Sequence, residues 1–507
     1  MMSKNFKQTT FGESEPKNID KWILSEFSAG GVCEQIARAK IEERYKHITE
    51  VSDLFNRQSV SYQLSKKDHI HRWLKYKEGF SADLVDNLLK EMKIDSGGWV
   101  LDPFLGSGTT SMVCKLRGIN SIGFDILPTS KVVVDAKNSI FNYDLNELED
   151  ARAWVMDYVL PTDYDGTINH INITDGAYTR EIDRELAYVS EWNRNSKFSE
   201  ELKNLIKLCV LNTLEQVSYT AKDGQYLRWD YRSKKIMEGN KKRVEQGKKP
   251  MVIRLDKGRI PTVKEVLIVE LGQVIHDIRS VQLGKRYEDN DAQLSFIGGS
   301  VLFNTLDLDS EFLDGVITSP PYCNRYDYTR TYALELAYLD LDRENVNELR
   351  QELLTCTVEN RSKLEKLKEY YISKDKTEDY EKVLNLVNNN EVLNEINSAL
   401  KKRADLGEIN NKGVISMVYG YFLELTFVYN ELYRMCKTGA HVAFVNDNVR
   451  YAGEVVPVDY ISTYIAESIG FKPIKVYALQ QQKGNSSQQM KKYGRVALRK
   501  SITLWRK

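Results

Sequence analysis

The sequence has few cysteines, few histidines and no excess of charge of either sign. Its 507 residues include six Cys and six His, and 72 Lys and Arg balance 72 Asp and Glu. The cysteines are scattered without a CxxC pair or a nearby His partner, which does not suit a disulfide framework or a structural zinc site. The zero net charge excludes a histone-like, purely electrostatic nucleic-acid binder but leaves room for a local basic groove.

Long apolar segments are also missing. The chain starts with Met-Met-Ser-Lys-Asn-Phe, which lacks the hydrophobic stretch of a signal peptide. No segment approaches the roughly 18 apolar residues that a membrane span needs. We therefore expect a soluble protein of the cytoplasm without a membrane partner. With 42% hydrophobic residues, the chain can bury a large core divided among several structural units.

A βαβ unit is predicted early in the chain. Trp99–Asp102 is expected to form a short buried strand, residues 111–117 a helix, and residues 121–125 a second strand. This order predicts a parallel sheet with a right-handed crossover. Upstream, Ser81 is the predicted N-cap of an amphipathic helix whose apolar positions are Leu84, Val85, Leu88, Leu89 and Met92.

The alternation of strands and helices then stops twice, at two long polar segments that are mainly helical. The second has balanced charges, so a solvated helical hairpin is expected there. Strands are predicted again at 294–299 and 313–318, and the chain ends with an antiparallel strand pair at 472–479 and 496–505. The fold class is therefore α/β, a Rossmann-like sheet with two largely helical insertions. The predicted organisation is an N-terminal helical arm (1–68), a cofactor-binding half (69–140), a helical insertion (141–290), a second sheet segment (291–340), another helical insertion (341–412) and a C-terminal sheet segment (413–507).

Residues 102–110, Asp-Pro-Phe-Leu-Gly-Ser-Gly-Thr-Thr, form a glycine turn between the first strand and its helix. Gly106 and Gly108 allow the backbone to pass close to a ligand, and the following helix N-terminus attracts a carboxylate. A phosphate-binding P-loop would require Gly-Lys-Ser/Thr, but Thr109 follows the second glycine. Asp125, at the end of the second strand, suits either a ribose diol or a helix cap.

Thr318-Ser-Pro-Pro-Tyr322 follows another apolar strand. Pro320 and Pro321 fix the backbone and remove N–H donors, so the carbonyls of Ser319 and Pro320 are left as acceptors. Such acceptors would hold the protons of an aromatic amine and make its nitrogen more nucleophilic. Tyr322 offers a ring face on which a flipped base could stack. A proline-rich turn at a strand end is the alternative, and it is favoured if the glycine turn is disregarded.

Together, the two segments resemble motifs I and IV of the DNA amino-methyltransferases, which methylate exocyclic nitrogens with S-adenosyl-L-methionine (SAM). In that family Ser-Pro-Pro-Tyr is typical of cytosine-N4 enzymes, and Asp/Asn-Pro-Pro-Tyr/Phe is typical of adenine-N6 enzymes. The resemblance covers about 70–130, 290–340 and 413–507. It implies SAM as cofactor, double-stranded DNA as substrate and N4-methylcytosine as product. It also implies a bacterial or archaeal restriction–modification system, in which a cognate endonuclease acts on the same site. No metal is expected, because the six histidines show no ligand spacing beyond His69-Ile-His71, and these two are expected at the surface.

The resemblance also implies roles for particular residues. The predicted cofactor contacts are Phe80, Ser81, Asp102, Phe104, Gly106, Gly108, Thr109 and, at the ribose, Asp125. The residues implied around the target base are Ser319, Pro320, Pro321 and Tyr322. The chain departs from the family pattern at Ser300, where an Asp commonly follows the glycine. A cytosine-C5 enzyme would need a Pro-Cys nucleophile, which this chain lacks. Adenine-N6 methylation, RNA amine methylation and a non-catalytic SAM-sensing DNA-binding subunit remain alternatives.

Three segments are candidates for DNA contact. Residues 222–254 contain eleven basic and four acidic residues, interleaved with Tyr226, Trp229 and Tyr231. Such a pattern suits phosphate contact and base stacking, although a solvated helical face is the common alternative. The amide-rich loop at 483–495 and the loop at 446–451 are expected to lie near DNA or the base pocket.

Overall fold

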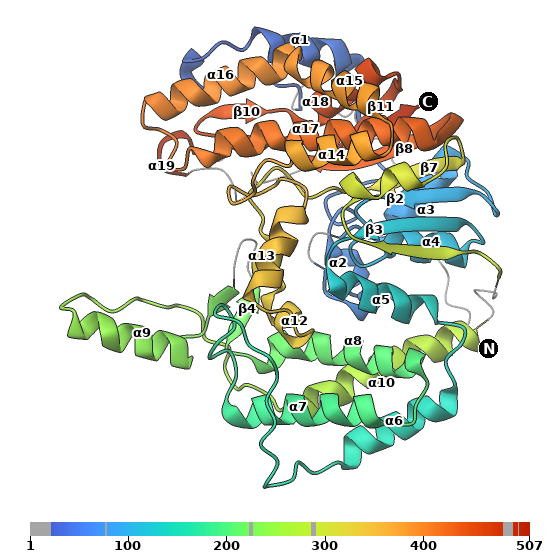
Figure 1. Ribbon diagram of the computed structural model, residues 1–507, viewed down its shortest axis with the longest axis vertical. Coiled ribbons are helices and arrows are strands. Elements are labelled where there is room, and N and C mark those ends of the chain that lie inside the picture. The colour runs from blue at the N-terminus through green and yellow to red at the C-terminus, as the bar shows by residue number, and fades with distance from the viewer. Residues whose placement is uncertain (1–21, 77–78, 223–226, 285–289, 480–489, 495) are drawn as a thin grey trace, which may run out of the picture.

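The centre of the molecule is an eight-stranded, mostly parallel sheet (Figure 1). The structure is a computed structural model that describes residues 22–76, 79–222, 227–284, 290–479, 490–494 and 496–507. Within the sheet the strands lie in the order β1 (Thr49–Val51), β11 (Lys472–Leu479), β12 (Lys500–Arg506), β8 (Cys436–Asp447), β7 (Leu313–Thr318), β2 (Trp99–Asp102), β3 (Asn120–Asp125) and β6 (Leu294–Gly298). Only β12 runs antiparallel to its neighbours, so the predicted α/β, Rossmann-like sheet with a terminal antiparallel pair is confirmed.

The apolar residues of the central strands alternate between the two faces of the sheet. Val100 and Ile317 pack against α3 (Ala82–Met92) and α4 (Thr109–Leu116), whereas Leu101 and Val316 belong to the core on the opposite face, beneath α17 (Gly413–Met435) and α18 (Val458–Ile469). Because both faces are covered, these strands are almost continuously hydrophobic in sequence. Ser81 caps α3 as predicted, since its hydroxyl accepts a hydrogen bond from the Leu84 amide.

The first insertion forms a helical layer at the far end of α5 (Pro128–Asn138), at the bottom of Figure 1. Its bundle consists of α6 (Leu145–Asp157), α7 (Arg180–Asn195), α8 (Glu200–Val217) and α10 (Val263–Gln282). A short hairpin, β4 (Thr220–Lys222) and β5 (Leu227–Trp229), leads to α9 (Lys234–Glu245), which projects away from the rest of the molecule. The expectation of a largely helical segment is therefore correct, with the hairpin as an addition.

The second insertion contains α13 (Arg343–Glu352), α14 (Leu364–Ser373), α15 (Thr377–Asn388) and α16 (Glu391–Asp405). The expectation of a solvated helical hairpin, which was based on the balanced charge, is wrong. Each of α14, α15 and α16 buries an apolar stripe in the core formed with α17, including Leu367, Val383, Val387, Ile396 and Leu400. Most charged residues of these helices occupy the outer faces, but Arg403 of α16 is buried and forms an ion pair with Glu454.

The N-terminal segment is only partly helical. It contains α1 (Ile36–Tyr45) and the one-turn α2 (Tyr62–Ser65), and it also adds β1 to the sheet, parallel to β11. Glu42, on the buried side of α1, accepts two hydrogen bonds from Arg499 at the other end of the chain. The segment is therefore an integral part of the core. The remaining short elements are α11 (Tyr328–Thr331), α12 (Ala333–Tyr338), α19 (Met490–Tyr493), β9 (Val449–Tyr451) and β10 (Glu454–Val456).

None of the helices within the described ranges combines the length and the apolar character required to cross a membrane.

Candidate cofactor and catalytic site

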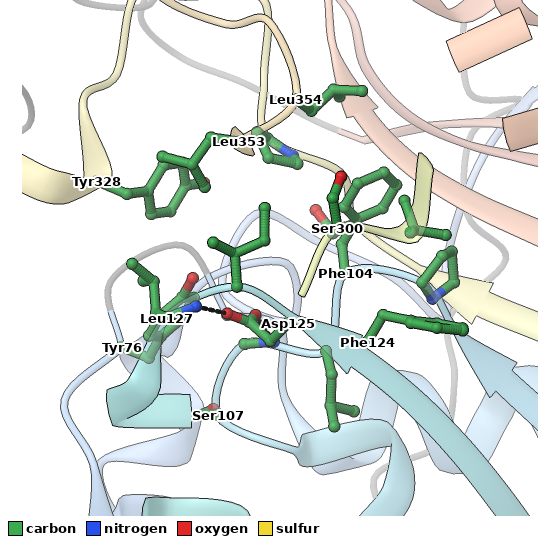
Figure 2. Close-up of a pocket in the computed structure, with 18 of the residues that line it drawn as sticks. Tyr76, Phe104, Ser107, Phe124, Asp125, Leu127, Ser300, Tyr328, Leu353 and Leu354 are labelled. Atoms are coloured by element: carbon green, nitrogen blue, oxygen red, sulfur yellow. Dashed lines mark hydrogen bonds between the residues drawn. The ribbon is translucent and has the colours of Figure 1, made fainter. Parts of the chain in front are cut away.

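A pocket with about 770 Å³ of free space opens at the carboxyl ends of β2, β3 and β7 (Figure 2). This is the edge at which open α/β sheets bind their ligands. The lining is mainly apolar with a few polar groups. The predicted residues that line it are Phe80, Phe104, Gly106, Thr109, Asp125, Ser319 and Pro321. The structure thus brings the two sequence motifs, about two hundred residues apart, to one cavity.

The glycine turn has a geometry that other residues could not adopt without strain. Gly106 and Gly108 both have positive φ, at 57° and 76°. A Cβ atom at Gly106 would lie 2.8 Å from a ring carbon of Tyr76, and one at Gly108 would lie 2.8 Å from a methyl group of Val134. Gly106 therefore gives the backbone direct access to the pocket. Gly108 lies outside the pocket lining and instead lets the start of α4 pack against α5.

Asp102 connects the two motifs rather than lining the cavity, which departs from its predicted role as a cofactor contact. One carboxylate oxygen accepts hydrogen bonds from the Thr318 hydroxyl, at 2.6 Å, and from the Phe104 amide. The other accepts one from the Thr110 hydroxyl at 2.7 Å. Since the side chain is 1% exposed, its role is to fix the glycine turn to the end of β7.

Asp125 lies in the pocket at the end of β3, as predicted. Its two carboxylate oxygens accept hydrogen bonds from the amides of Gly106 and Leu127, each at 2.8 Å, and the second bond is drawn in Figure 2. Burial raises the pKa of this carboxyl to about 6 despite those two bonds. Each oxygen keeps a further lone pair, so the group can accept from a pair of vicinal hydroxyls.

Replacing Asp125 by alanine is expected to weaken SAM binding about 10- to 100-fold, because a hydrogen bond to a charged group contributes about 1.5–3 kcal/mol. The affinity of the unaltered protein should also fall as the pH drops through about 6, where the carboxylate gains a proton and loses acceptor capacity. Isothermal titration calorimetry between pH 5 and 8 measures both effects.

The matched control is Asp135→Ala, which removes a carboxylate from the exposed side of α5. It should bind SAM with unchanged affinity and keep the pH dependence of the unaltered protein. If Asp125→Ala binds SAM as tightly as this control does, the carboxylate has no role in binding the cofactor.

Ser319 and Pro321 reach the pocket, whereas Pro320 and Tyr322 lie behind its lining. The Tyr322 ring is 7% exposed, its hydroxyl accepts a hydrogen bond from the Ser319 hydroxyl at 3.1 Å, and the Lys500 ammonium lies 4.8 Å from the ring centroid. The segment at 446–451 lies beside this one, because the Tyr451 hydroxyl donates to the carbonyl of Cys323, and its role at the target base remains a prediction.

Ser81 does not line the pocket, because its buried hydroxyl is used to cap α3. Conversely, several lining residues were not predicted. Tyr76 stacks on Tyr328 and Tyr332 with centroid distances of 6.4 and 5.4 Å, and Figure 2 shows Tyr328 at one side of the cavity. Tyr76 belongs to a stretch rich in aromatic and basic residues that precedes Phe80. This pattern could have identified Tyr76 as a candidate from the sequence. The others are Gly79, Pro103, Leu105, Ser107, Phe124, Ile126, Leu127, Gly299, Ser300, Val301, Leu302, Leu353 and Leu354.

A buried lysine supports the glycine turn from below. The Lys137 ammonium donates to the carbonyl of Ser107 at 2.7 Å, and burial lowers its pKa to about 7. His71 lies close by and is buried, although the sequence suggested a surface residue. Burial and the nearby lysine lower the pKa of His71 to about 3, so its ring is neutral at ordinary pH.

Among the described residues, His69, His276 and Asp277 form the group with metal-ligand spacing. The Asp277 carboxylate already accepts hydrogen bonds from the guanidinium of Arg72, the indole of Trp73 and the amide of Ile70. Its acceptor capacity is therefore used to fasten the segment before the pocket to α10. That the protein needs no metal ion remains a prediction.

Comparison with known proteins places the chain in a family. A family model described as DNA methylase matches residues 12–133. The type II methyltransferase M.BsoBI of Geobacillus stearothermophilus is 55% identical over 95% of this chain and 94% of its own length. The type II methyltransferases M.AvaI of Nostoc sp. and of Anabaena variabilis are 34% identical over 98% of this chain and 97% of theirs. The chain therefore belongs to the DNA amino-methyltransferases of type II restriction–modification systems.

Proposed function

We propose that the protein transfers a methyl group from SAM to the exocyclic N4 amine of a cytosine in double-stranded DNA. The observation that carries the proposal is the position of Ser319 and Pro321 at the rim of the pocket that also contains Asp125 and the glycine turn. The serine is the element that favours cytosine, because an Asp or Asn at that position is typical of adenine-N6 enzymes.

The pocket residues fit SAM by their chemistry. Asp125 presents two acceptor oxygens to a ribose diol, and the apolar walls of Phe104, Leu127 and Val301 suit a flat purine. The start of α4 directs backbone N–H groups without helical partners toward the side where a carboxylate would bind. Bound there, the cofactor supplies an electrophilic methyl group attached to a sulfonium.

The chain's own residues prepare the acceptor. The carbonyls of Ser319 and Pro320 accept hydrogen bonds from the two amine protons, so the nitrogen lone pair is withdrawn from the ring. Tyr322 contributes a ring surface for the extruded base, which must leave the helix to reach the pocket. Methyl transfer would form a bond between this nitrogen and the methyl carbon while the carbon–sulfur bond breaks, and one amine proton would pass to solvent water. No side chain becomes covalently attached to the base.

The test is product identity. The protein is incubated with labelled SAM and either unmodified DNA or RNA, and the nucleic acid is digested to nucleosides and separated. N4-methylcytosine is the expected product, and N6-methyladenine as the sole labelled nucleoside would refute the cytosine assignment. Label in RNA alone would refute the DNA assignment. Sequencing of modified bases in cells that express the gene would give the target sequence.

In this proposal the enzyme acts on genomic DNA in the cytoplasm of a prokaryotic cell. A methyl group at its target would protect that site from a cognate restriction endonuclease. The two enzymes then share a recognition sequence and need not bind each other.

A further inference from the structure

The most prominent protrusion of the molecule is the α9 arm, which we define as residues 233–254. It consists of α9 and the extended chain that returns along it, and it projects from the helical layer of the first insertion (Figure 1). The 12 residues of α9 span about 18 Å at 1.5 Å per residue. Ile236 is the only buried residue of this helix, so burial in a hydrophobic core does not account for the arm's position.

The arm is nevertheless a defined structure. Asn240 and Met251 exchange two hydrogen bonds between α9 and the returning chain, and the Arg243 guanidinium donates to the carbonyl of Lys249. At the base, Lys235 donates to the carbonyl of Asn172 at 2.8 Å and lies 4.5 Å from the Trp229 ring centroid. These contacts hold the arm at a fixed position relative to the insertion.

The base of the arm is fixed further by a buried polar cluster. The Lys257 ammonium donates to three backbone carbonyls, those of Glu215, Ser218 and Thr220. The Lys257 amide donates to the Asp230 carboxylate, which is fully buried. The same carboxylate also accepts a hydrogen bond from the Arg232 guanidinium. That guanidinium holds the pKa of the Asp230 carboxyl below its usual range.

The arm concentrates positive charge in a protein that is neutral overall. It contains eight basic and two acidic residues. Five of the cations are exposed and, among the described residues, have no acidic partner: Lys241, Lys242, Lys248, Lys249 and Arg254. Not every basic residue of the wider 222–254 stretch contributes, because Lys222 is buried and forms an ion pair with Glu335. Lys241, Lys242, Lys248 and Lys249 lie near the far end of α9, whereas Arg254 lies near the base of the arm.

The arm projects on the side of the sheet where the cofactor pocket opens. Leu353 and Leu354, which line the pocket, directly follow α13, and α13 lies between the sheet and the arm in Figure 1. A duplex placed with one base in the pocket continues for many base pairs beyond it. Because DNA carries one negative charge per about 1.7 Å of helix axis, an 18 Å basic helix matches several phosphates.

We propose that the α9 arm binds the phosphate backbone of the duplex at a distance from the methylated base. Lys241, Lys242, Lys248 and Lys249 make sequence-independent contacts that position the DNA while the pocket receives the target base. The exposed apolar side chains of Met237 and Val244 lie on the same helix beside the lysines and contact the sugar edge. This role of the arm rests on the proposed function in one respect, namely that the protein acts on double-stranded DNA.

The experiment compares the full-length protein with the variant Lys241→Gln/Lys242→Gln. Affinity for a labelled duplex of arbitrary sequence is measured by fluorescence anisotropy at several salt concentrations. Each lost phosphate contact should reduce the slope of log affinity against log salt by about one, so a reduction of about two is expected. SAM affinity and the methylation rate at saturating DNA should stay within twofold. Lys248→Gln/Lys249→Gln should behave in the same way.

The matched control is Lys366→Gln/Lys368→Gln, which removes the same charge from exposed positions on α14. Its salt slope should equal that of the unaltered protein. A slope that is unchanged in the arm variants, or reduced equally in the control, would overturn the proposal. So would a change of oligomeric state in the arm variants with an unchanged slope, which would identify the arm as a protein contact. Product identity is not measured, so failure of the N4 assignment gives a separate result.

Discussion

Tyr322→Ala is expected to reduce the methyl-transfer rate at saturating substrates by at least about 100-fold while the affinity for SAM changes less than twofold. Misplacement of a reacting group by about 1 Å can cost a factor of this size. Tyr322 belongs to the Ser-Pro-Pro-Tyr segment, and its hydroxyl accepts a hydrogen bond from the Ser319 hydroxyl. It lies outside the cofactor pocket lining, so cofactor binding should be preserved. Single-turnover rates and calorimetric SAM titrations measure the two quantities.

Tyr322→Phe separates the two contributions of the side chain. It keeps the ring on which a base would stack and removes only the hydroxyl that accepts a hydrogen bond from Ser319. We expect most of the rate to return in this variant. Full activity in Tyr322→Ala would show that the tyrosine has no part in the reaction, and a loss of SAM binding in the same variant would show that its role is structural.

Glu42→Ala is expected to lower the free energy of unfolding by about 3–5 kcal/mol, the cost of removing one partner from a buried ion pair. Glu42 is 3% exposed and holds the Arg499 guanidinium at 2.8 Å, while Asp459 binds the same guanidinium from the other side. Without Glu42, part of that buried positive charge is no longer compensated. Chemical denaturation followed by circular dichroism measures the change.

Glu43→Ala is the control on the same helix. The neighbouring carboxylate is 71% exposed and forms a surface pair with Lys46, which contributes less than about 1 kcal/mol. Equal effects of the two substitutions would contradict the view that the N-terminal segment is fastened to the core through Glu42.

The elements that the sequence predicted correctly are those whose residues have no alternative environment. The bounds of β7 match the prediction because Val316 and Ile317 must be buried on opposite faces and Pro320 ends the ladder. The glycine turn was recognisable because its positive φ values require glycine at Gly106 and Gly108. These local constraints were sufficient to locate the part of the pocket that is formed by the glycine turn and Asp125.

Other features depend on tertiary contacts that leave little local signal. The helices α14 to α16 have the same amphipathic pattern whether their apolar stripes are packed or partly solvated, so their burial against α17 was not predicted. Leu353 and Leu354 belong to a polar insertion and reach the pocket only because the chain returns after α13. Lys222 is in a basic stretch, yet it is paired with Glu335, which is 113 residues away in sequence.

Most of the amide-rich loop proposed as a DNA contact, at 483–495, lies outside the described residues. Of its described part, Tyr493 is held by Arg403 and Glu408, which places the end of this segment against α16 and the residues that follow it. Its expected role in reading bases stays a prediction.

The ion pair between Glu42 and Arg499 has a consequence for the order of events during synthesis. Its two partners are 457 residues apart, and translation at about 5–20 residues per second needs about 20–90 s to pass from one to the other. Until the segment that contains Arg499 leaves the ribosome, the buried Glu42 carboxylate of α1 lacks this partner. A nascent chain therefore cannot complete this buried ion pair before it is released from the ribosome.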